Sequence, residues 1–301
     1  MNPDTPRYGT SGAFLRALNH RLRDAARVTG RPVEELRREF LTHRFLARVF
    51  SRPNSGWVLL GGGGLLVRLP GGRHSRDLDL LHTTSTDGDA LLELREVVAE
   101  QRPDPLTFQL GPAKKMSGLT TGARIMVTAL AGPSRAGTFP VDLSTERTIV
   151  ARTERIRPRP IIELDDVAPL PEFVLYPLPD QVADKVCTIY GRYGSHRSPS
   201  TRYHDLVDLV LILRGCQLDA AQTRTAIRMQ EARRGFTVPV NLTAPGAVWS
   251  AGYRASAQNS SLPPALHELD DALTAVRTFL APLLTDSITA GLWNPHAQAW
   301  G

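Results

Sequence analysis

A run of four glycines between two apolar segments constrains this chain most. Residues 57–60 are typical of a short buried strand, Gly61 to Gly64 follow, and residues 65–67 are apolar with a helical pattern. Glycine permits tight turns and close approach to a phosphate, and a helix N-terminus favours anions. A purely structural turn would use the same residues. The run is not followed by the Gly-Lys-Ser/Thr of a P-loop, and a Rossmann Gly-x-Gly-x-x-Gly pattern fails at Leu66.

Two aspartates follow the glycine run, in the sequence Ser-Arg-Asp-Leu-Asp. On a strand, Asp77 and Asp79 would share one face and lie about 6–7 Å apart. Two such carboxylates repel each other unless a cation lies between them, and oxygen ligands indicate Mg²⁺. An acidic edge strand facing water would have the same pattern. The order of strand, Gly-Gly, helix and Ser-x-Asp-x-Asp strand is more specific than either part alone.

Lysine is rare in this basic chain. Basic residues number 36 against 30 acidic ones, for a net charge of +6, and only Lys114, Lys115 and Lys185 are lysines. A basic surface attracts the phosphates of nucleotides and nucleic acids, although an arginine-rich composition alone gives the same charge. Lys185 lies in a helical pattern, where the alternatives are a solvated lysine and a compact ammonium bound to phosphate.

Asp208 lies in an apolar helical pattern over residues 202–214. A carboxylate in such surroundings is expected to be paired with a cation or to be active. Asp205 is three residues earlier on the same helix face, where a negative charge near the helix N-terminus is favourable. Trp249 and Tyr253 are large aromatic residues for which we expect core packing in preference to stacking on a base.

Three segments resemble the AbiEii/MenT-type nucleotidyltransferase toxins of the DNA polymerase β-like nucleotidyltransferase superfamily. The resemblance rests on Val58-Leu59-Leu60-Gly61-Gly62-x-x-Leu65 with Arg73-x-Ser75-x-Asp77-x-Asp79, on Gln181-x-x-x-Lys185, and on Arg202-x-His204-Asp205-Leu206-x-Asp208-Leu209. It covers roughly residues 15–285. Two positions depart from the family pattern: Leu60 stands where a Lys often precedes the Gly-Gly pair, and Gly63-Gly64 where Ser or Thr is common.

The resemblance implies a Mg²⁺-dependent transfer of a nucleoside monophosphate from an NTP. It places the third carboxylate of the metal site at Asp142, between apolar residues of a predicted strand, so that Asp77, Asp79 and Asp142 would hold two Mg²⁺ ions. The remaining roles that it implies are nucleotide binding by Gly61, Gly62, Ser75 and Lys185, and catalysis by Lys185 and Asp208 together with the three metal ligands.

The acceptor that the resemblance implies is RNA, most concretely the 3′ end of tRNA, where an added nucleotide would block aminoacylation and translation. A toxin also implies a cognate antitoxin protein. The alternatives are nucleotide transfer to a small molecule or to a protein, a glycosyltransferase that uses Asp-x-Asp for a sugar nucleotide, and a catalytically inactive nucleic-acid-binding protein. The upstream Gly-Gly turn argues against the glycosyltransferase, and the presence of all three acidic positions argues against the inactive protein.

The expected fold is α+β (α/β) and bilobal, with a nucleotidyltransferase core built on a mixed sheet and a C-terminal helical bundle that closes an active-site cleft. We expect domains at 1–168 and 169–301, with a Pro-rich linker over 157–179. The predicted strands are 57–60, 77–81, 105–110, 123–130 and 138–144. The predicted helices are 14–25, 33–49, 90–100, 181–193, 202–214, 220–233 and 262–284.

The sequence also predicts a cytoplasmic protein. No apolar run approaches the ~18–20 residues that cross a bilayer, and residues 1–6 lack a secretory pattern. Cys187 and Cys216 are the two cysteines, too few for a disulfide framework or a zinc ribbon. No membrane partner is expected.

Overall fold

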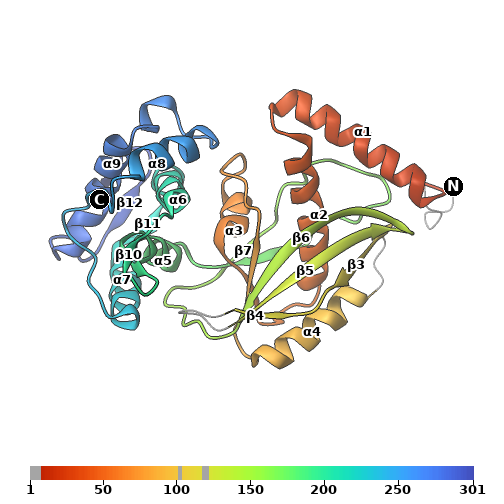
Figure 1. Ribbon diagram of the computed structural model, residues 1–301, viewed down its shortest axis with the longest axis horizontal. Coiled ribbons are helices and arrows are strands. Elements are labelled where there is room, and N and C mark those ends of the chain that lie inside the picture. The colour runs from red at the N-terminus through yellow and green to blue at the C-terminus, as the bar shows by residue number, and fades with distance from the viewer. Residues whose placement is uncertain (1–7, 101–103, 117–121) are drawn as a thin grey trace. The chain divides into compact units, whose positions relative to one another are not determined.

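The computed structural model describes residues 8–100, 104–116 and 122–301. The chain divides into two compact units (Figure 1). The first unit comprises residues 1–63, 75–147 and 155–175, and the second comprises residues 64–74, 148–154 and 176–301. The described residues form a mixed α/β fold, which confirms the expected class.

The sheet of the first unit is mixed. Its strand order is β3 (Leu106–Leu110), β5 (Gly122–Ala131), β6 (Ser134–Ser144), β2 (Leu78–His82), β1 (Trp57–Leu59), β8 (Phe173–Leu175) and β7 (Glu154–Ile156), and β4 (Lys114–Met116) also pairs with β5. β2 runs parallel to β6 and antiparallel to β1, whereas β5 runs antiparallel to β6.

Helices cover one face of this sheet. Phe45 of α2 (Val33–Val49) packs edge-on against Phe139 of β6, with the ring centroids 5.5 Å apart. On α4 (Asp87–Ala99), Glu93 accepts a hydrogen bond from Trp57 Nε1 on the same face of the sheet. α1 (Ser11–Thr29) packs against α2 and ends at Gly30, whose left-handed backbone caps the helix. Burial alternates along β5, with Ile125 buried and its neighbours exposed, so the opposite face of the sheet, called the open face below, is exposed to solvent at β5.

The Pro-rich stretch 157–179, expected to be a linker, contributes a strand. β8 lies within it and pairs in parallel with β1, with Leu59 opposite Leu175. Phe173 and Leu175 are fully buried, so this segment belongs to the core of the sheet. The expectation failed because the pairing is non-local, and three residues carry too short a pattern to indicate a strand between prolines.

The second unit is mainly helical. Its helices are α5 (Leu178–Tyr190), α6 (Tyr203–Gly215), α7 (Ala220–Arg234), α8 (Trp249–Gln258), η1 (Pro264–Leu266) and α9 (Leu269–Leu284). Small sheets join β9 (Arg192–Tyr193) to β10 (Ser198–Pro199), and β11 (Leu218–Asp219) to β12 (Leu292–Asn294) and β13 (Ala299–Trp300). α6 contacts α5, α8 and α9, and every residue from 205 to 213 is buried.

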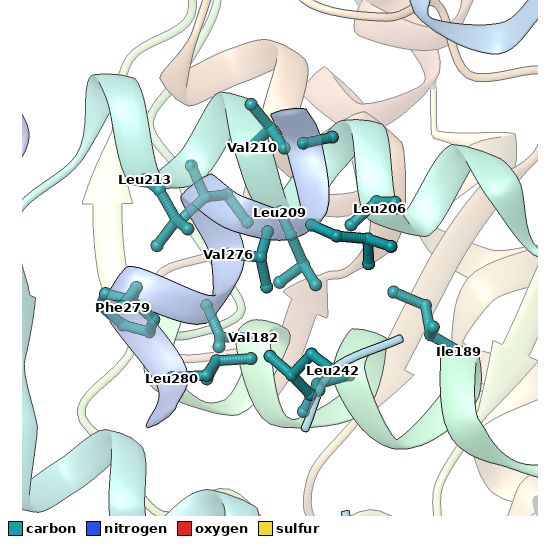
Figure 2. Packing of buried hydrophobic residues seen from close by; sticks show 14 of the residues in the cluster. Val182, Ile189, Leu206, Leu209, Val210, Leu213, Leu242, Val276, Phe279 and Leu280 are labelled. Carbon is teal, nitrogen blue, oxygen red and sulfur yellow. The ribbon is translucent and has the colours of Figure 1, made fainter. Parts of the chain in front are cut away.

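Apolar side chains from three of these helices meet in one cluster. Figure 2 shows Val182 of α5, Leu209 of α6 and Phe279 of α9 converging. Burial of such side chains removes apolar surface from water and contributes about 25 cal/mol per Å². Trp249 and Tyr253 also lie in this cluster and are fully buried, so the expected core packing of both is confirmed.

Candidate active site

Two of the predicted carboxylates lie side by side on the open face of the sheet. Asp79 of β2 is the register partner of Asp142 of β6, and the two strands are parallel. The next strand places Arg124 of β5 opposite Asp142. Residues at the same register position of neighbouring strands point to the same face, so the three side chains form one row. The neighbouring row of Leu78, Val141 and Ile125 is buried.

β2 begins at Leu78, so Asp77 lies one residue before the strand that was predicted to begin with it. The side chain of Asp77 is 44% exposed and still reaches the row, because its Oδ2 lies 3.3 Å from Nη2 of Arg124. Ser75 donates a hydrogen bond from its Oγ to the carbonyl of Asp77, at 2.8 Å. This bond shapes the turn that leads the chain into β2.

Arg124 is a member of this row that the sequence analysis missed. Its Nε and Nη2 each donate a hydrogen bond of 2.6 Å to Asp142, one to each carboxylate oxygen. These bonds and the charge of Asp142 raise the pKa of the Arg124 guanidinium further above its ordinary value. Nothing local distinguishes Arg124 from the many other arginines, and only the pairing of β5 with β6 places it on Asp142.

Gly61 leaves room for the carboxylate of Asp79, because it has no side chain. Its φ is +61°, and a Cβ at this position would lie 2.0 Å from Asp79 Oδ2. The backbone N–H of Leu60 donates to the carbonyl of Asp79 at 2.9 Å, which fixes the two segments against each other. Gly61 begins α3 (Gly61–Arg68), so the glycine run forms the first turn of a helix, and Gly62 is buried within it. Only glycine fits the first position.

A second cluster of charges lies within the helical unit. Lys185 of α5 donates from Nζ to Asp208 Oδ2 at 2.7 Å and to Asp205 Oδ1 at 3.0 Å. Arg73 binds both oxygens of Asp208, at 3.2 and 3.1 Å, and Arg202 binds Asp205 at 2.6 Å. The side chains of Lys185, Asp205 and Asp208 are at most 8% exposed. Asp208 is thus paired, as a carboxylate among apolar residues was expected to be.

The electrostatics of this cluster favour the charged forms of Lys185 and Asp205. Burial lowers the pKa of Lys185, but the charges of Asp208 and Asp205 outweigh it and raise the pKa above its ordinary value. Burial likewise raises the pKa of Asp205, but the cations Lys185 and Arg202 outweigh it and hold this pKa well below the usual range. Lys185 and Asp205 are therefore both charged over the physiological pH range.

The predicted site residues fall into two groups, one in each unit. Asp77, Asp79, Asp142, Gly61 and Ser75 belong to the first unit, and Lys185 and Asp208 to the second. The first group has the donor chemistry for a hard divalent cation, since it offers carboxylate oxygens at the same register of parallel strands. In the described parts of the chain no three His, Cys, Asp or Glu side chains are arranged as metal ligands. Asp142 instead directs both of its oxygens to Arg124.

The cysteines show no sign of reactivity. Burial raises the pKa of the Cys187 thiol to about 12 and that of Cys216 to about 11, and both are free thiols. A protonated, buried thiol is a poor nucleophile.

Among the described residues, no helix has the length and hydropathy that a membrane span requires.

A family model for the nucleotidyl transferase AbiEii toxin of a type IV toxin–antitoxin system matches residues 44–275. The chain belongs to this family. Its members are nucleotidyltransferases, and the chain is therefore an enzyme of this class and a toxin of such a system. Membership implies an NTP substrate and an antitoxin partner, and enzymes of this class generally use a divalent metal.

The chain is also similar to solved structures at low sequence identity. MenT4, a nucleotidyltransferase toxin from Mycobacterium tuberculosis, aligns with a TM-score of 0.59 at 18% identity, over 88% of this chain and 89% of that one. JHP933 from Helicobacter pylori aligns with a TM-score of 0.45 at 14% identity, over 84% of this chain and 92% of that one. No curated protein sequence matches this AbiEii family member significantly.

Proposed function

We propose that this enzyme transfers a nucleoside monophosphate from an NTP to RNA, most concretely to the 3′ end of tRNA, in the cytoplasm. The reaction joins the acceptor hydroxyl oxygen to the α-phosphorus and releases pyrophosphate. A nucleotide added to the tRNA 3′ end would prevent aminoacylation and stop translation. The observation that carries the proposal is the row of Asp79 and Asp142 on the open face of the sheet, beside a glycine that admits no side chain.

Asp77, Asp79 and Asp142 are the residues that would hold Mg²⁺, and we propose that two Mg²⁺ ions bind there. When bound, the metal polarises phosphate oxygens and neutralises developing negative charge. The chain's own contribution is to align the carboxylates. The β2–β6 pairing fixes Asp79 beside Asp142, and Gly61 leaves room for the Asp79 carboxylate.

Gly61, Gly62 and Ser75 would bind the phosphates of the NTP. Backbone N–H groups at the start of α3 point toward its N-terminus, which favours an anion there, and glycines let the phosphates approach closely. The Ser75 hydroxyl donates to the carbonyl of Asp77, and to bind a phosphate oxygen it would rotate and donate its one O–H to that oxygen instead.

Lys185 would bind a phosphate oxygen, and Asp208 would orient its ammonium group. An ammonium group has three N–H donors, and the contacts of Lys185 with Asp205 and Asp208 account for two of them. Arg73 supports this assignment, because it binds Asp208 and lies only four residues before Asp77 in the sequence. We propose that both groups of residues act on the same nucleotide, and that the chain functions as the domains 1–168 and 169–301.

The basic character of the chain, with a net charge of +6, supports RNA as the acceptor, because the phosphate backbone attracts cationic surfaces. The test is to incubate the protein with Mg²⁺, each α-³²P-labelled NTP in turn, and total RNA. We expect label on RNA of tRNA length, at its 3′ end, and none with Asp79→Asn. Label on protein or on a small molecule would support the alternative acceptors and contradict the RNA proposal.

A further inference from the structure

The row that contains Asp79 and Asp142 continues across two more strands with the opposite charge. Arg124 of β5 is the register partner of Asp142, and Lys114 of β4 is the register partner of Arg124. The open face of the sheet therefore carries two cations next to two carboxylates, in the order Lys114, Arg124, Asp142, Asp79. Lys114 is one of three lysines in the chain.

Arg124 occupies both oxygens of Asp142 and also reaches Asp77. Its two hydrogen bonds to Asp142 are 2.6 Å long, and its Nη2 lies 3.3 Å from Asp77 Oδ2. The side chain of Asp142 is only 14% exposed, whereas that of Arg124 is 47% exposed. The guanidinium can thus leave the carboxylates by rotating toward solvent, without opening the apolar core.

The two short hydrogen bonds from Arg124 take one lone-pair position on each oxygen of Asp142, and they hold a positive charge beside the carboxylate, where it opposes the approach of a divalent cation. We propose that Arg124 is a positioning residue that competes with the divalent cation for Asp142 and Asp77, and that it turns to the phosphates of the nucleotide when the cation is bound. This inference rests on the proposed metal site. Lys114 lies on the side of Arg124 away from Asp142 and would add a second positive charge that attracts the phosphates of the nucleotide.

The competition has a consequence for metal binding. A metal ion alone must displace the Arg124 guanidinium, whereas a metal ion that arrives with a triphosphate offers the guanidinium a new partner. Metal and nucleotide therefore bind cooperatively, and each raises the affinity for the other by the same factor. Metal without nucleotide binds weakly, which limits unproductive loading of the site.

The test measures binding of Mn²⁺ alone, from the electron paramagnetic resonance signal of the free ion, with no nucleotide present. Arg124→Gln is expected to bind Mn²⁺ about three- to tenfold more tightly than wild type, the range set by a bidentate but half-exposed ion pair. Arg135→Gln removes the same charge from an exposed position at the other end of β6 and is expected to change the affinity less than twofold. Lys114→Gln removes a charge one strand farther from Asp142 and should have a smaller effect than Arg124→Gln.

Unchanged or weaker Mn²⁺ binding by Arg124→Gln would overturn the inference, provided that Asp79→Asn weakens binding. If neither Asp79→Asn nor Asp142→Asn alters Mn²⁺ binding, the proposed metal site itself fails. Arg124→Lys keeps the charge without the fork of two donors and is the variant to use if Arg124→Gln does not fold. We expect it to bind Mn²⁺ more tightly than wild type, and equal affinity would contradict the competition.

Discussion

Lys185 Nζ lies 2.7 Å from Asp208 Oδ2 inside the helical unit, where both side chains are at most 8% exposed. A buried ion pair of this kind is costly to break, because removal of one partner leaves an uncompensated charge. The contact also fixes the ammonium group in one position. Its geometry suits a compact point charge, whereas a guanidinium is planar and larger.

Lys185→Arg is therefore expected to lose most activity, nearly as much as Lys185→Ala. The loss of one charge-assisted hydrogen bond corresponds to about ten- to a hundredfold in kcat/KM for the NTP. Lys115→Arg, at an exposed lysine, is the matched control and should retain wild-type kcat/KM. Near-wild-type activity of a folded Lys185→Arg would show that charge alone suffices.

Acid is expected to destabilise the protein partly through Asp205. The ordinary pKa of its carboxyl group is 3.8, and the folded state holds it lower through Lys185 and Arg202, against the effect of burial. The stabilisation is thus complete above the unfolded pKa and is lost as the pH falls below about 4 toward the folded value. Urea unfolding between pH 7 and pH 2 should show a smaller acid-induced loss of unfolding free energy in Asp205→Asn. An equal acid-induced loss of unfolding free energy in the wild type and in Asp205→Asn would contradict a lowered pKa of Asp205 in the folded state.

Gly61→Ala is expected to abolish activity. The new Cβ would lie 2.0 Å from Asp79 Oδ2, and the residue would keep a positive φ of 61°. The strain costs about 1–3 kcal/mol, and the carboxylate must move. Gly63→Ala is the control in the same helix, since its Cβ would meet its nearest atoms at 3.5 Å. Thermal unfolding and nucleotide transfer should both separate the two variants, and equal activity would remove Gly61 from the site.

Asp79→Asn should abolish nucleotide transfer while the protein stays folded. The substitution removes a ligand charge without emptying the apolar core, and metal-assisted charge stabilisation supplies several kcal/mol, so we expect a loss of at least about a hundredfold. Glu163→Gln, at an exposed position of the same unit, should leave the rate unchanged. Full activity of Asp79→Asn with Mg²⁺ would end the proposed mechanism.

Expression of the wild-type chain without its antitoxin is expected to arrest bacterial growth, because blocked tRNA ends deplete aminoacyl-tRNA. Asp79→Asn at matched expression should allow growth, since it lacks the transferase activity. The readout is growth rate together with the fraction of tRNA that can be aminoacylated. Arrest with fully aminoacylated tRNA would point to another acceptor.

Local sequence patterns determined much of the fold. The apolar periods of residues 33–49 and 202–214 correspond to α2 and α6, because a helix face repeats every 3.6 residues and is visible within one segment. The prediction of a single helix over 262–284 was less accurate, since the structure has two helices there, η1 and α9. Gly61 and Asp79 could also be recognised from local sequence, because the glycine run and the Asp-x-Asp pair are unusual patterns that lie close together in the chain.

Tertiary structure alone decided which side chains meet. The pairing of β5 with β6 brings Arg124 onto Asp142, and α5 and α6 bring Lys185 between Asp205 and Asp208. These partners lie 18 to 23 residues apart in the chain, and no local period records their contact. The sequence by itself marked the carboxylates and the rare lysine, whereas strand register and helix packing chose the cations that neutralise them. The physical reason is that strand pairing and helix packing are long-range contacts, in which one arginine among many is selected only by position.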